Sequence, residues 1–159
     1  MAKLTFLGTS AQAVVAIGTD IDANTKVTIQ GNSYTLSDLI TINNLVVQPI
    51  TLLVTAASQP LSGTAEDLTD ALAGITNYTG AITLTDAPVA TTDIAAALQL
   101  TTGKVTATVS GTATDLLAVL DNAKPTGALT LGVRAATAAQ LKALDAKTSV
   151  AVDASAVLA

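Results

Sequence analysis

The stretch Lys104–Leu120, KVTATVSGTATDLLAVL, contains both kinds of element from which the rest of the chain is built. Its first half alternates aliphatic residues with threonine, the period-two pattern of a strand with one buried face. At Thr112 a Thr-Ala-Thr-Asp-Leu sequence begins, in which a threonine N-cap is followed three residues later by an acid, as at the start of a helix. Leu116 and Leu120 continue this pattern at helical spacing. The stretch therefore predicts a strand followed at once by a short helix.

The same helix-start pattern recurs along the chain. A threonine or small residue, two variable residues, Asp or Gln, and then Leu or Ile begin at positions 35, 64, 90, 112 and 137. A degenerate sixth copy begins at Thr9. Self-similarity at a period of about 20 to 50 residues is the signature of a repeat architecture. We therefore expect residues 1–159 to form a single repeat domain, with divergent N-terminal strands or a cap in residues 1–34 and strand–helix repeats in residues 35–155.

The strand segments between the helices place aliphatic residues on one face and threonines on the other. In a doubly wound sheet both faces are buried and the strands read as continuous apolar runs, so the alternation indicates helices on one face only. The sequence thus predicts an α/β fold, an open right-handed solenoid of about five to six strand–helix repeats with a parallel sheet. The residues expected to point inward are Val27, Ile29, Ile50, Leu52, Val54, Ile82, Leu84, Val105, Ala107, Val109, Leu129, Leu131, Val133, Val150 and Val152. The threonine face consists of Thr28, Thr51, Thr83, Thr85, Thr106, Thr108 and Thr130.

The composition argues against several classes of function. Half of the 159 residues are hydrophobic but only 2% are aromatic, so the core is expected to be aliphatic. The net charge is −5 and the seven basic residues are scattered, which leaves no basic patch for nucleic acid. Histidine and cysteine are absent, which removes Ser-His and Cys-His nucleophiles, and we expect no enzyme. No apolar run is long enough for us to expect a membrane span.

Three segments carry a resemblance to known repeats. They are Ser62-Gly-Thr-Ala-Glu-Asp-Leu68, Gly111-Thr-Ala-Thr-Asp-Leu116 and Ala143-Leu-Asp-Ala-Lys-Thr-Ser-Val-Ala-Val-Asp-Ala-Ser155. They resemble the strand–helix repeats of large cyanobacterial and marine bacterial surface or matrix proteins, and of virion proteins of their phages. The resemblance covers roughly residues 62–155. It implies a repeat architecture and an extracellular, cell-surface or virion location, and it assigns no functional residue.

The two ends of the expected solenoid are apolar, whereas solitary solenoids need polar terminal repeats. The chain begins with a strand-like pattern around Phe6 and Leu7 and ends with the apolar segment 155–159. One terminus folding back as a cap, or a chain excised from a longer array, would also account for this. We expect end-to-end stacking of copies into an extracellular filament, sheath, surface layer or virion component. Phe6, Leu7, Val157 and Leu158 are the residues expected to be buried at that junction.

The threonine face suggests an alternative function. Threonines in ranks on a flat sheet can match ordered water, as in ice-binding solenoids, or bind a surface polysaccharide. Threonine is also the best β-former for an exposed strand face, which explains the pattern without any ligand. Leu53 and the last strand, with Ser149, Ala151 and Asp153, interrupt the rows and weaken the ice interpretation.

Asp20-Ile-Asp22-Ala-Asn24 has the beginning of a calcium-binding loop. Thr25 stands where such a loop needs glycine, and Gly31 stands where it needs glutamate. We expect a polar turn before the next strand, with Asp20, Asp22 and Asn24 as a candidate Ca²⁺ site. No other cofactor is expected.

Overall fold

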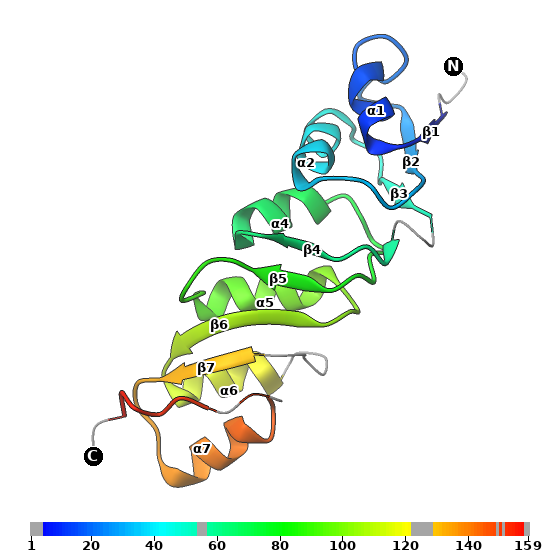
Figure 1. Ribbon diagram of the computed structural model, residues 1–159. Coiled ribbons are helices and arrows are strands. Elements are labelled where there is room, and N and C mark those ends of the chain that lie inside the picture. Colours follow the sequence, from blue (N-terminus) through cyan, green and yellow to red (C-terminus); the bar gives the residue numbers. More distant parts are fainter. Residues whose placement is uncertain (1–4, 54–56, 122–128, 149, 151, 158–159) are drawn as a thin grey trace.

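Strands and helices alternate along the chain, and the computed structural model describes residues 5–53, 57–121, 129–148, 150 and 152–157 (Figure 1). All strand pairs in it are parallel. The predicted α/β chain of alternating strand–helix units is confirmed. The elements are β1 (Thr5–Gly8), α1 (Ser10–Ala16), β2 (Lys26–Ile29), α2 (Leu36–Leu45), β3 (Thr51–Leu52), β4 (Leu61–Gly63), α4 (Ala65–Leu72), β5 (Ile82–Leu84), α5 (Thr91–Leu100), β6 (Val105–Gly111), α6 (Ala113–Asp121), β7 (Leu129–Val133) and α7 (Ala138–Asp145).

The strands form two parallel sheets, of order β1-β2-β3 and β4-β5-β6-β7. The sequence predicted one sheet. The difference lies in the third layer, the strand–helix unit that contains β3, β4 and α4. There the chain leaves the first sheet after β3 and enters the second at β4. Leu53 in this interval points toward solvent, with 42% of its surface exposed. Pro60, directly before β4, has no N–H to give to a ladder. The interruption therefore falls where the strand alternation and the hydrogen-bonding capacity both fail.

The two sheets are nevertheless connected through the segment that precedes β5. Ile50 forms a parallel bridge with Ile75, and the Asn77 side-chain amide bonds both the N–H and the C=O of Leu52. The Thr79 N–H donates to the Ala57 carbonyl oxygen at 2.7 Å. The amide of Asn77 thus replaces a backbone ladder partner, and the order of layers continues from the first sheet to the second.

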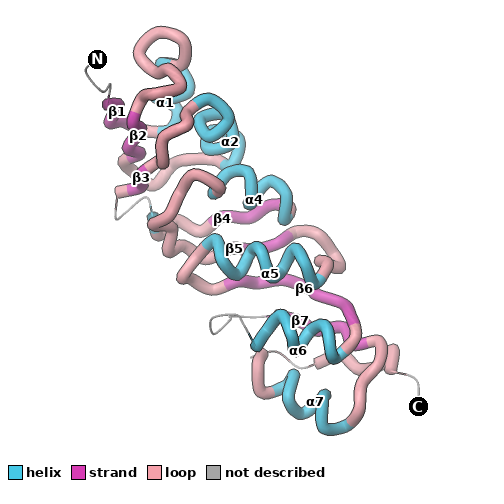
Figure 2. Tube along the Cα trace, turned by 180° about the vertical axis from the view of Figure 1, so that it is seen from behind, coloured by secondary structure: helices cyan, strands magenta, loops and turns pink. Residues whose placement is uncertain are grey.

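All helices lie on one side of the strands, and each packs beside the helix of the next unit (Figure 1, Figure 2). The molecule is elongated, with β1 and α1 at one end and α7 at the other (Figure 1). The longest described helices have ten residues, and no described helix is long and apolar enough to cross a bilayer.

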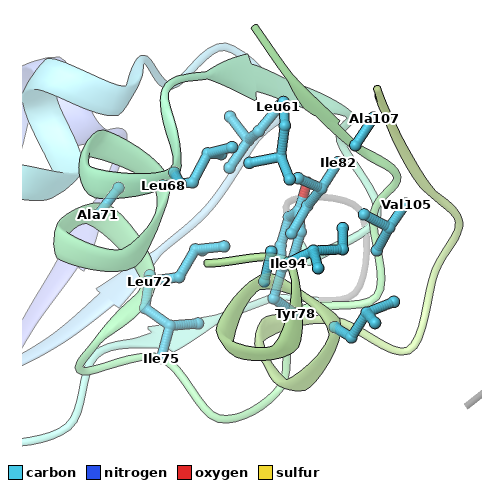
Figure 3. Close-up of a cluster of buried hydrophobic side chains, with 14 of the residues drawn as sticks. Leu61, Leu68, Ala71, Leu72, Ile75, Tyr78, Ile82, Ile94, Val105 and Ala107 are labelled. Carbon is cyan, nitrogen blue, oxygen red and sulfur yellow. The ribbon is translucent and has the colours of Figure 1, made fainter. Parts of the chain in front are cut away.

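The core between strands and helices is aliphatic, as predicted. Every residue expected to point inward from Val27 to Val133 is buried, apart from Val54, which lies outside the described residues. Val150 and Val152 in the last layer are only half-buried. Figure 3 shows side chains of three successive units packed together, with Leu68 from α4, Ile82 from β5, Ile94 from α5 and Val105 from β6. Each layer is therefore packed mainly by its immediate neighbours.

The predicted helix starts are confirmed at five threonines. The Oγ1 atoms of Thr9, Thr35, Thr64, Thr112 and Thr137 accept a hydrogen bond from the backbone N–H three residues later. The full reciprocal capping box occurs in α1 and α7, where that later residue is glutamine. The glutamine side chain reaches back to the N-cap N–H in both helices. The sixth start, at Ala90, has a methyl side chain that cannot accept a bond.

Candidate assembly surfaces

The N-terminal end of the stack exposes apolar side chains from β1 and α1. Leu7 is 62% exposed and Val15 is 83% exposed, while Phe6 is half-buried. These three residues, with Ala16 and Asp20, line an open groove of about 590 Å³. Phe6 and Leu7 therefore lie on the N-terminal end surface. The sequence analysis missed Val15, although a valine on the solvent side of a helix was the signal that could have identified it.

The C-terminal end has a second, smaller groove between α7 and the last layer. Its volume is about 430 Å³, and it is lined by Leu141, Lys142, Asp145, Val152 and Ala154. In the following turn, the Val157 N–H donates to the Ala154 carbonyl oxygen at 3.0 Å. Val157 is half-buried against the core, and Leu158 lies outside the described residues. The structure thus places one of the two predicted C-terminal contact residues at this end.

Hydrogen bonds from the Ser155 N–H and side chain lower the pKa of the exposed Asp153 carboxyl. The bond from the Ser155 N–H to Asp153 Oδ1 measures 2.9 Å and holds the start of the turn. A carboxylate that is ionised over a wide pH range therefore stands at the edge of the last layer.

Both terminal layers present a strand edge. The Gln30 N–H donates to the Gly8 carbonyl oxygen at 2.8 Å, so the backbone groups of the adjacent Leu7 point away from β2. At the other end Asp153 exchanges two bonds with β7, to Leu131 and from Val133, each of 2.8 Å. The backbone groups of Val152 therefore point away from β7. Among the described residues these two edges have no strand partner, and such edges are templates for pairing with another chain.

A comparison of equivalent helix positions shows where the C-terminal end lacks a neighbour. The fourth helical residue packs toward the strands and is at most 1% exposed in five helices: Ala13, Leu39, Leu68, Ile94 and Leu116. The equivalent residue of α7 is Leu141, which is only half-buried. The apolar side chain that the repeat pattern provides at this position is thus incompletely covered in the last helix.

The threonine face is organised in short rows by the strand register. Thr28 is the direct partner of Thr51, Thr83 of Thr106, and Thr108 of Thr130. Thr83, Thr85, Thr106 and Thr108 are exposed, and the other three are half-buried. Adjacent parallel strands bring such partners to about 4.8 Å from each other. The break between the two sheets separates the first row from the other two.

The structure shows the Asp20 to Asn24 segment as a polar turn. Asp22 Oδ1 accepts bonds from the Asn24 N–H and the Thr25 hydroxyl, both of 2.9 Å. The Asp22 side chain is therefore engaged in the turn itself. Within the described ranges no three His, Cys, Asp or Glu side chains are arranged to hold a metal ion.

An acidic groove of about 590 Å³ lies between α4 and α5, and the sequence analysis did not predict it. Glu66, Asp70, Asp86 and Asp93 line it. Asp86 Oδ2 accepts a 2.7 Å bond from the Ala65 N–H at the start of α4, so this carboxylate stabilises the first turn of the helix. The four acids come from two helices and a loop, and no spacing along the chain brings them together.

Two buried tyrosines occupy the core near the break between the sheets. Burial raises the pKa of Tyr34 to about 12 and also raises that of Tyr78, where the neighbouring Tyr34 adds to the effect. Both phenols are therefore held in the neutral form.

With these surfaces in place, the comparisons with known proteins add no relative: no protein-family model, no curated protein and no solved structure matches the chain.

Proposed function

We propose that this chain is a non-enzymatic structural protein, an open right-handed solenoid that assembles with copies of itself by end-to-end stacking. Parallel strands joined through helices are right-handed in nearly all known cases, which supports the handedness. The observation that carries the proposal is that each end of the stack has a groove with exposed or half-buried apolar side chains beside a strand edge, whereas the inward-pointing strand residues from Val27 to Val133 that the structure describes are buried.

The proposed junction joins the N-terminal end of one copy to the C-terminal end of the next. The outward edge of β1 pairs with the edge at Val152, and Phe6 and Leu7 pack against Val157 and Leu158 of the neighbour. Such a contact uses two different surfaces, so it can repeat without limit and gives a filament, or a ring if the rotation closes. Strand addition of this kind supplies main-chain hydrogen bonds in addition to apolar burial.

The setting we propose is outside the cell, as part of a filament, sheath or surface layer, or in a phage virion. The support is the resemblance of residues 62–155 to repeats of bacterial surface, matrix and virion proteins. The proposal involves no nucleic acid, no membrane span and no cofactor.

A binding module is the second candidate function. The observation that favours it is the pairing of Thr83 with Thr106 and of Thr108 with Thr130 on an exposed sheet face. Hydroxyl rows of this kind could bind ice or a surface polysaccharide. Thermal hysteresis, or glycan binding that is lost in Thr83→Tyr/Thr106→Tyr, would support this function.

The test of assembly uses negative-stain electron microscopy and light scattering on the untagged protein over a range of concentrations. We expect polymers for the native sequence and monomers for Leu7→Asp and Val157→Asp. Leu53→Asp is the matched control, because Leu53 is also exposed but directly follows β3 and lines neither end groove. Circular dichroism and a thermal melt must show that each variant is folded. A native chain that stays monomeric at high concentration contradicts the proposal.

A further inference from the structure

We infer that the C-terminal groove is a seat for helix α1 of a second copy, with Val15 against Leu141 and Asp20 paired with Lys142. This rests on the proposed function, and it adds a helix contact and an orientation to the strand junction described above.

The apolar part of the inference follows from the repeat itself. The fourth residue of α1, α2, α4, α5 and α6 packs toward the strands and is covered so completely that at most 1% of it remains exposed. Leu141 lacks part of this cover and lines an open groove with Val152 and Ala154. A helix with apolar residues on its outer side would complete the packing that the internal helices already have.

Helix α1 carries apolar residues on its outer side. Val15 is the most exposed large hydrophobic residue of the described chain, and it lines the N-terminal groove with Ala11 and Ala16. The equivalent residues of the other helices are Thr41, Asp70, Ala96, Ala118 and Ala143, which are polar or small. Among the helices that the structure describes, a valine therefore occurs at this position only in α1, at the N-terminal end.

The charges of the two ends are complementary. Asp20 is the charged residue that lines the N-terminal groove, and it is exposed. Lys142 lines the C-terminal groove and is exposed as well. In α1, α2, α5 and α6 the position of Lys142 is occupied by Val14, Ile40, Ala95 and Leu117, and in α4 by Thr69. Asp145 also lines this groove, three residues from Lys142. Its negative charge would repel Asp20, so the attraction between the two ends depends on Lys142.

The inference is tested by charge reversal at two exposed sites. In Asp20→Lys the junction brings two lysines together, and in Lys142→Asp it brings two aspartates together. We expect each variant alone to need a protein concentration at least about tenfold higher for polymers to form. An equimolar mixture of the two variants should recover assembly, because every junction in an alternating polymer is again matched. The double variant in one chain should recover it too.

Two further variants test the apolar contact. Val15→Asp should abolish polymers, whereas Val47→Asp should not, because Val47 is 71% exposed but lies on the turn after α2. Lys104→Glu, on the exposed turn before β6, is the control for charge change alone.

The possible outcomes separate the two proposals. A native chain without polymers overturns the proposed function. Polymers that respond to Leu7→Asp and Val157→Asp but not to Val15→Asp or to charge reversal leave the strand junction standing and overturn the helix seat. Recovery in the mixed sample establishes the head-to-tail orientation, since a contact between two N-terminal ends would not respond to Lys142→Asp.

Discussion

The hydroxyl of Tyr78 donates a hydrogen bond of 2.7 Å to the backbone carbonyl oxygen of Gln59, one layer earlier in the stack. The same hydroxyl lies 3.1 Å from the Ala81 carbonyl oxygen. Tyr78 is 2% exposed, so these contacts are made inside the core. A single phenol thus connects the interrupted third layer to the layer that follows it.

We predict that Tyr78→Phe lowers the free energy of unfolding by about 1–3 kcal/mol, because it leaves the Gln59 carbonyl oxygen without the phenol donor that Tyr78 supplies. Urea unfolding followed by circular dichroism measures the change. Tyr34→Phe provides a comparison at the second buried tyrosine. A Tyr78→Phe protein as stable as the native chain would show that the bond to Gln59 contributes nothing net.

Stability should also depend on pH in the alkaline range. The pKa of Tyr34 is about 12 in the fold against 10.0 when unperturbed, and the pKa of Tyr78 is raised as well. The folded state favours the neutral phenols. Their contribution to the free energy of unfolding is therefore complete below pH 10 and is lost as the pH rises through the folded pKa values. We expect the urea midpoint to be level up to about pH 9 and to fall above pH 10. The fall should be smaller in Tyr78→Phe.

Helix α5 offers a stabilising substitution. Ala90 has the same extended N-cap conformation as Thr64, with φ −69° and ψ 152° against −67° and 161°. Ala90→Thr should therefore accept a bond from the Asp93 N–H and raise the unfolding free energy by about 0.5–2 kcal/mol. The reverse change, Thr64→Ala, should lower it by a similar amount. Thermal melts of both variants test the pair, and a destabilised Ala90→Thr would contradict it.

Equivalent leucines in an internal and a terminal helix should contribute different amounts to the free energy of unfolding. Leu68 is fully buried in α4, so Leu68→Ala is expected to cost about 2–5 kcal/mol. Leu141 is half-buried in α7, and Leu141→Ala should cost clearly less in the monomer. Denaturant unfolding at a concentration below any assembly compares the two. Equal costs would mean that Leu141 is as well packed as the internal residues.

The broad threonine face should be dispensable for end-to-end assembly. Thr83→Tyr/Thr106→Tyr places bulk on two exposed positions of neighbouring strands, far from either end groove. We expect unchanged polymers by light scattering. Loss of polymers in a folded double variant would indicate that this face takes part in assembly.

The repeat predicted much of the fold because each strand and each helix start is encoded locally. The alternation of Val105 and Val109 with threonines, and the N-cap at Thr112, depend only on neighbouring residues in the sequence. The break between β3 and β4 was not predicted, although Leu53 and Pro60 mark it in the sequence, because the side-chain bonds that replace the ladder there join Asn77 to Leu52, 25 residues apart. A Cβ at Gly103 would lie 2.5 Å from the Gly80 carbonyl oxygen of the preceding layer, a contact between layers that the local sequence does not show.

The candidate surfaces were predicted less completely. Phe6 and Leu7 follow from an apolar pattern at the start of the chain. Val15 and Leu141 become informative only when the exposure of equivalent helix positions is compared. Exposure is a property of the folded chain and cannot be obtained from the sequence pattern. The acidic groove between α4 and α5 likewise arises from packing, because Asp86 and Glu66 come from separate elements.

The replacement of a ladder partner by the amide of Asn77 has a consequence for how the chain can vary in length. Since each layer is held mainly by the one before and the one after, whole strand–helix units could be gained or lost by unequal recombination while the remaining layers keep their packing. The interrupted third layer is the exception, because side-chain bonds join it to the next layer, from Asn77 to Leu52 and from Tyr78 to Gln59. Descendants of this chain should therefore differ in the number of units after β5 more readily than in the two units that meet at Asn77.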